Sequence, residues 1–219
     1  MEEIKTKAIV LTNKDYSDSD KIVSVFSADY GKINIKFNGV KKAKAKLKPL
    51  IQPFSLIDLE CMKRGDFFTA KTGMVLSSYP KITLDYQKTI CAYILVEILN
   101  QVLPKNKPET EIFIKAINSL NQIEHANHYI ATIDFITSFF ALLGEELNLD
   151  ISSNKIFLDL NFANFSPERT NNSIEIDKKC YQALTRYSEN DSINKMCLKL
   201  LNNVLRAKYD VEINSFSFL

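Results

Sequence analysis

The chain has 219 residues, an apolar content of 46% and a formal net charge of +2. This composition excludes a disordered chain, because it supplies enough apolar surface to build a core. The charge is unevenly divided: residues 1–80 hold 14 Lys and Arg against 9 Asp and Glu, whereas residues 81–219 hold 14 against 17. We therefore expect the first part of the chain to meet a polyanion.

The start of the chain and its cysteines indicate a cytoplasmic protein. The chain opens with Met1-Glu2-Glu3, which is acidic, and no apolar segment follows, so no signal peptide is expected. No run approaches the roughly 18 apolar residues of a membrane span. The four cysteines lie far apart and form no C-x-x-C pair. This spacing argues against a structural zinc site and for buried, reduced thiols.

Five short strands are predicted before residue 80. Ile33, Ile35 and Phe37 alternate with polar residues, which is the period of a half-buried strand. Glycine-containing turns at 29–31 and 63–66 separate the apolar runs. The predicted strands cover 8–11, 22–26, 33–37, 54–59 and 67–76. Five strands within about 75 residues fit a small barrel of the OB-fold type.

The pattern becomes helical after Pro80. Apolar residues recurring at three and four predict helices over 84–102, from about 108, over about 128–147, over 178–187 and over 193–208. Two short strands are predicted at 156–160 and 173–176, and the tail 213–219 is predicted to be extended. The fold class is therefore α+β, with an OB-fold domain over 1–79 and a mainly helical domain over 80–219.

Catalytic groups are sparse. A metal site or a nucleophilic triad would need His125 or His128, and neither has further ligands or an activated nucleophile nearby in sequence. The three aspartates of NKDYSDSDK lack the glycine and the distal glutamate of a calcium loop. We interpret them as a turn whose side chains accept hydrogen bonds from backbone amides. No catalysis, cofactor or metal is predicted.

The stretch NGVKKAKAKLKPL, residues 38–50, carries five lysines within eight positions and no acid. Such a run can simply keep a domain soluble. OB barrels, however, hold single strands in a basic groove with aromatic platforms, and Tyr30, Phe37 and Phe54 are nearby, either as platforms or as core. The predicted DNA-binding residues are Lys32, Lys36, Phe37, Lys41, Lys42, Lys44, Lys46, Lys48, Lys63 and Arg64.

Three segments resemble the RecO family of bacterial recombination mediators. The opening AIVLTNKDYSDSDKIVSVFSADYGKI resembles its first strands, with spaced acids before a basic residue and then a glycine turn. The segment GVKKAKAKLKPLIQPFSLIDLECMKRGDFFTAK resembles its basic loop and the strand that follows. The end, LLNNVLRAKYDVEINSFSFL, resembles its last helix and closing tail.

The resemblance implies an OB-fold joined to a helical domain. It also implies binding of single- and double-stranded DNA, strand annealing, and loading of RecA together with RecR onto DNA coated by single-strand-binding protein. The C-terminal tail of that protein would dock on the helical domain, and the location would be the cytoplasm, at the nucleoid. The lysines at 41, 42, 44, 46 and 48 stand where the family has its basic loop.

One departure concerns zinc, because many members carry a four-cysteine module after the third helix. In this chain the region 149–177 has no cysteine, and Ser152, Ser153 and Asn154 stand where the first pair is expected. We expect the strand pair to persist without metal. Two other functions stay open: an interaction adaptor that does not bind DNA, and an RNA-binding OB-fold protein.

Overall fold

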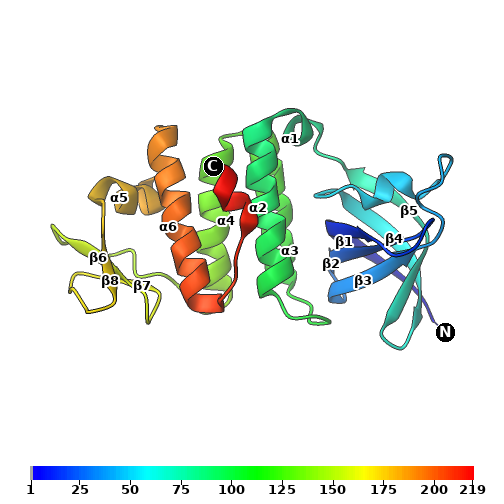
Figure 1. The fold of residues 1–219 in the computed structure, drawn as a ribbon, viewed down its shortest axis with the longest axis horizontal. Helices are drawn as coiled ribbons and strands as arrows, with labels where there is room; N and C mark the ends of the chain where they lie inside the picture. Colours follow the sequence, from blue (N-terminus) through cyan, green and yellow to red (C-terminus); the bar gives the residue numbers. More distant parts are fainter. Residues whose placement is uncertain (1) are drawn as a thin grey trace.

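The computed structural model describes residues 2–219 and is elongated (Figure 1). A barrel lies at one end, a bundle of helices in the middle, and a small sheet with a short helix at the other end. None of the helices in the described part of the chain is both long and apolar enough to cross a membrane.

Five strands form a closed barrel in the order β1-β2-β3-β5-β4. Antiparallel pairing joins all neighbours except β3 and β5, which run parallel and close the barrel through Ile35 beside Phe68. The short helix η1 (Lys48–Ile51) lies between β3 and β4. The bounds are β1 (Glu2–Asp15), β2 (Lys21–Ser27), β3 (Gly31–Phe37), β4 (Leu56–Arg64) and β5 (Phe67–Ser77). The predicted OB-fold type is confirmed.

The apolar run 8–11 of β1 is buried on both faces of the strand. Ala8 and Val10 point into the barrel core, whereas Ile9 and Leu11 belong to the hydrophobic cluster of the helices. When both faces of a strand are buried, its sequence is a continuous apolar run and not an alternation of apolar and polar residues. The helices therefore pack directly on the outer surface of the barrel.

Six α-helices, a small sheet and a terminal 3-10 helix follow the barrel in the described part of the chain. They are α1 (Pro80–Leu84), α2 (Tyr86–Val102), α3 (Thr110–His125), α4 (His128–Leu142), α5 (Lys178–Arg186), α6 (Asp191–Tyr209) and η2 (Asn214–Phe218). The first predicted helix begins at Tyr86 rather than at residue 84, because the side chain of Asp85 caps α2 by accepting from the amides of Gln87 and Lys88. The short helix α1 before it was not predicted. The third ends at Leu142, earlier than predicted.

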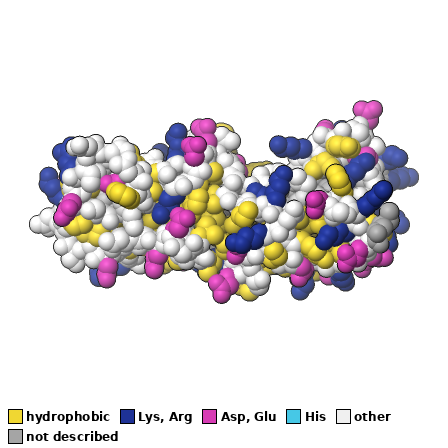
Figure 2. All heavy atoms as spheres, turned by 90° about the horizontal axis from the view of Figure 1, so that it is seen from below, with side chains coloured by type: hydrophobic (Ala, Val, Ile, Leu, Met, Phe, Trp, Pro, Cys, Tyr) yellow, Lys and Arg dark blue, Asp and Glu magenta, His cyan; other side chains and the backbone are white. Residues whose placement is uncertain are grey.

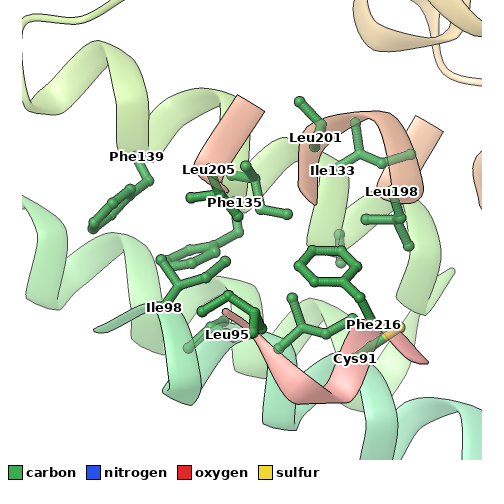
Figure 3. Close-up of a cluster of buried hydrophobic side chains, with 14 of the residues drawn as sticks. Cys91, Leu95, Ile98, Ile133, Phe135, Phe139, Leu198, Leu201, Leu205 and Phe216 are labelled. Carbon is green, nitrogen blue, oxygen red and sulfur yellow. The ribbon is translucent and has the colours of Figure 1, made fainter. Parts of the chain in front are cut away.

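The bundle core is made by α2, α4 and α6 with the C-terminal tail (Figure 3). Aromatic and aliphatic side chains from these elements point toward one another, with Phe135 and Phe139 from α4 among them and Phe216 entering from the tail. The predicted extended tail is wrong. It forms η2, because Phe216 is drawn into this core and Ser215 donates from its amide and hydroxyl to Glu97.

The far end contains three strands rather than the predicted pair. They are β6 (Ile156–Asp159), β7 (Asn164–Ser166) and β8 (Ser173–Ile176), in the order β7-β6-β8. Asp159 ties the turns together: it accepts from the amides of Asn161 and Phe162 at 2.8 and 3.2 Å and from the Thr170 hydroxyl at 2.8 Å. β7 was missed because three residues are too few to show a period.

All four cysteines are buried and free. Burial raises the pKa of the thiols of Cys61 and Cys91 to about 12, so both stay protonated at neutral pH. Cys180 and Cys197 lie side by side with their sulfur atoms 3.3 Å apart. Within residues 2–219, no group of three or more His, Cys, Asp or Glu side chains is placed to hold a metal ion.

Candidate nucleic-acid interface

The lysine-rich segment is fastened to the β1–β2 loop. Asp20 accepts a hydrogen bond from the Gly39 amide at 2.8 Å and pairs with Lys36 at 3.1 Å. The Gly39 amide, followed by Lys36, lowers the pKa of the Asp20 carboxyl to about 2. The amide of Lys41 donates to the Ser19 carbonyl at 3.0 Å. The aspartates therefore do form a turn, and one of them bonds an amide of the basic loop.

Lys41 differs from the other lysines of the loop. Its ammonium group lies 3.0 Å from the carboxylate of Asp15, which also pairs with Lys21 at 3.0 Å. Hydrogen bonds from these two lysines hold the pKa of Asp15 below its usual range. The remaining lysines of the loop are exposed, and none pairs with a carboxylate in the described part of the chain. They are Lys42, Lys44, Lys46 and Lys48.

The outer face of β3 extends the basic surface. Lys32, Asn34 and Lys36 alternate with the buried Ile33, Ile35 and Phe37, so all three face away from the barrel core. The Lys36 ammonium lies 5.0 Å from the centre of the Tyr16 ring in the β1–β2 loop. Tyr16 is 62% exposed, which makes it an aromatic surface beside a cation.

The β4–β5 hairpin supplies a second aromatic and further charge. Phe67 is 80% exposed, and the next residue, Phe68, lies opposite Ile35 inside the barrel. Alternation therefore turns Phe67 outward, beside the exposed face of β3. Lys63 lies over the Tyr30 ring at 5.0 Å, and Arg64 at the hairpin tip is exposed.

Phe37, predicted to bind DNA, and Phe54, left open as platform or core, are both core residues. Phe37 is fully buried because it shares the inward side of β3 with Ile33 and Ile35. Phe54 is buried against Tyr93 at the junction with α2, with ring centres 4.8 Å apart. Neither ring can stack on a base while the barrel is closed. In the described barrel, Tyr16 and Phe67 are the exposed rings, and their only signal in the sequence was their place beside turns.

The predicted basic residues fall into two groups. Lys32 is turned toward the helices and donates to the carbonyl of Asn100, so it is half-buried. The others surround the outer face of the barrel, on β3, the basic loop and the β4–β5 hairpin. On the face seen in Figure 2, lysine and arginine side chains gather most densely over the barrel end of the molecule.

The fold and this surface define an OB-fold protein with a basic barrel face and a C-terminal helical bundle. Two family models match the chain: Recombination protein O N terminal over residues 1–79, and Recombination protein O C terminal over residues 83–212. The chain belongs to the Recombination protein O family.

Curated relatives carry the name DNA repair protein RecO. The one from Geobacter metallireducens is 28% identical over 151 residues, which is 68% of this chain and 62% of that protein. The one from Caldanaerobacter subterraneus is 26% identical over 214 residues, 96% of this chain and 83% of that protein. The one from Nitrosococcus oceani is 30% identical over 126 residues, 58% and 50% of the two chains. Two of these three matches span less than two thirds of the relative.

Proposed function

We propose that the protein is a non-catalytic mediator of DNA repair and recombination that binds DNA through its barrel. The observation that carries this proposal is the exposed lysine loop, fastened by Asp20 beside a barrel face with two exposed aromatic rings. Ammonium groups bind phosphates and release counterions, whereas aromatic rings stack on bases without reading sequence. The names of the curated relatives support the same role.

The test is fluorescence anisotropy of a labelled single-stranded oligonucleotide over a salt series. If five lysines meet phosphates, the log–log slope is about −3.5, and affinity falls about a hundredfold between 50 and 200 mM salt. Changing Lys42, Lys44 and Lys46 to Glu should weaken binding strongly and flatten the slope by about 2.

The matched control changes three exposed lysines of the helical part, Lys178, Lys179 and Lys199, to Glu. It alters the net charge equally and should leave the slope unchanged. If the two triple variants changed DNA affinity and salt slope equally, the loop would be a solubilising segment and not the DNA contact. Absence of binding at low salt would instead favour the adaptor function. Competition between matched DNA and RNA strands separates the RNA-binding alternative.

The partner proteins are a separate part of the proposal. We propose that the protein anneals strands in the cytoplasm, at the nucleoid. With RecR, it would promote RecA loading onto DNA coated by single-strand-binding protein. A pull-down with single-strand-binding protein, with and without its last residues, tests the docking of its tail. Capture that persists without the tail would contradict tail docking but not DNA binding.

A further inference from the structure

A groove separates the outer face of the barrel from the C-terminal end of α2. Its volume is about 480 Å³. The residues that matter for its chemistry come from both parts of the chain: Lys14, Ser24, Lys32 and Asn34 from the barrel, and Asn100 and Lys105 from the bundle side. Lys14, Asn100 and Lys105 did not enter the predicted site, because they are isolated in the sequence.

The segment carrying Lys105 is fixed to the barrel by backbone contacts. The amide of Asn106 donates to the carbonyl of Lys32 at 3.0 Å, and Lys32 and Lys105 form an isolated parallel bridge. Gly31 lies so close to the Lys107 carbonyl that a Cβ atom there would be 2.1 Å from its oxygen. Lys105 is therefore held beside β3 although it belongs to the α2–α3 connection.

The groove concentrates positive charge. Burial, and then the nearby ammonium group of Lys105, lower the pKa of Lys32. Asp15 is the one acidic residue among those lining the groove, and it is already paired with Lys21 and Lys41. Lys32 and Lys105 are therefore two positive charges held close together with no unpaired carboxylate beside them. A bound anion would stabilise such a pair.

The walls of the groove also present hydrogen-bonding groups. The Ser24 hydroxyl donates to the Asn100 side-chain carbonyl at 3.0 Å, which leaves the amide NH₂ of Asn100 as a donor. Asn34 on β3 is exposed. Side-chain amides form hydrogen bonds with the Watson–Crick edges of unpaired bases. In a duplex these edges are occupied by base pairing.

We propose that this groove binds a phosphodiester segment of single-stranded nucleic acid and that Lys105 contacts its phosphate. The strand then runs from the barrel face onto the helical part of the molecule. This inference rests on the proposed function, because it extends the same interface. A groove of about 480 Å³ between the barrel wall and α2 admits a single strand but not a rigid duplex. A duplex would therefore lie across the mouth of the groove and reach fewer of its lining groups than a single strand would.

The experiment compares Lys105→Glu with Lys107→Glu in the full chain. Lys107 belongs to the same segment, pairs with Glu109 at 2.7 Å and does not line the groove, so it controls for net charge. The probes are a labelled oligo-dT and a blunt duplex of equal length. Thermal unfolding of each variant checks that it is folded.

Lys105→Glu should weaken oligo-dT binding roughly tenfold and flatten its salt slope by about 0.7, while duplex binding changes much less. Equal behaviour of the two variants would overturn the groove contact. The proposed function would survive that result if reversal of the loop lysines still removed binding. Equal losses for oligo-dT and duplex would overturn the single-strand assignment. Absence of any binding by the unaltered protein would overturn both proposals.

Discussion

At Gly31 the backbone of the barrel lies directly against the backbone of the α2–α3 connection. Its φ of +67° lies in the left-handed region, and its missing side chain leaves room for the Lys107 carbonyl. Gly65 has a similar φ of +59°, but nothing lies within 4 Å of where its Cβ would be. Substitutions at Gly31 and Gly65 therefore distinguish two contributions to stability: the strain of a left-handed backbone and the clash with a neighbouring backbone.

Gly31→Ala should lower the free energy of unfolding by about 3 kcal/mol, since strain and a backbone clash add together. Gly65→Ala should cost only about 1 kcal/mol, because it carries the conformational penalty alone. Urea unfolding of both variants measures the difference. Equal losses would contradict the close approach at Gly31.

A second prediction concerns the pH dependence of the fastened loop. The pKa of Asp20 is lowered to about 2 in the folded protein, so its contribution to stability is complete above the ordinary aspartate range. That contribution is lost as the pH falls through about 2. Carbon-detected NMR titration of the Asp20 carboxyl should give a midpoint near 2.

Lys36→Gln should raise this midpoint only partly, because the Gly39 amide is the larger cause of the shift and remains. Asp20→Asn identifies the signal by removing it. A midpoint near the ordinary aspartate value in the unaltered protein would mean that the two loops are not tied in solution.

At the scale of elements, η2 shows how a short tail becomes part of the core. Its sequence alternates like a strand, yet Phe216 is buried among the bundle helices (Figure 3). Phe218, two residues later, is 59% exposed. Tertiary contacts override weak local preference in such short segments.

Phe216→Ala should therefore destabilise the protein by about 3–5 kcal/mol, the usual cost of emptying a large buried site. Phe218→Ala removes the same side chain from the same element and should change stability by only about 0.5 kcal/mol. Denaturant unfolding midpoints compare them. Similar midpoints for the two variants would show that the tail does not dock as described.

At the scale of the whole molecule, barrel and bundle share hydrophobic surface. Phe26 of β2 contacts Phe113 of α3 edge to face, with ring centres 5.7 Å apart. Ile9 and Leu11 of β1 lie in the same cluster as the helices. The division into domains at residue 79 stays a prediction, and the shared surface indicates that the two parts stabilise each other.

Residues 1–79 expressed alone should be less stable than the same residues in the full chain, because removing the bundle exposes the outer apolar side of β1 and β2.

In the full chain, Phe26→Ala should lower the free energy of unfolding by about 3–5 kcal/mol. The Phe26→Ala variant should also exchange its backbone amide hydrogens faster in both the barrel and the bundle. Exchange that changes in the barrel alone would indicate two independent units.

Much of the architecture was determined by local sequence. The alternation of β3 and the periodic helices predicted the barrel and the bundle, because these patterns report the direction of neighbouring side chains. The lysine run without an acidic residue predicted the basic loop. The apolar pattern did not locate the helix ends: α2 begins two residues later than predicted, because the cap residue Asp85 sets its start.

Only the tertiary structure decided which surfaces are covered. Phe37 and Phe67 are equally apolar in sequence, yet closure of the barrel buries one and exposes the other. Lys14, Lys32 and Lys105 are brought to one groove by contacts between segments more than 70 residues apart. The periodicity of the sequence cannot reveal such a site, because the groove is assembled by packing between elements that are distant in the chain.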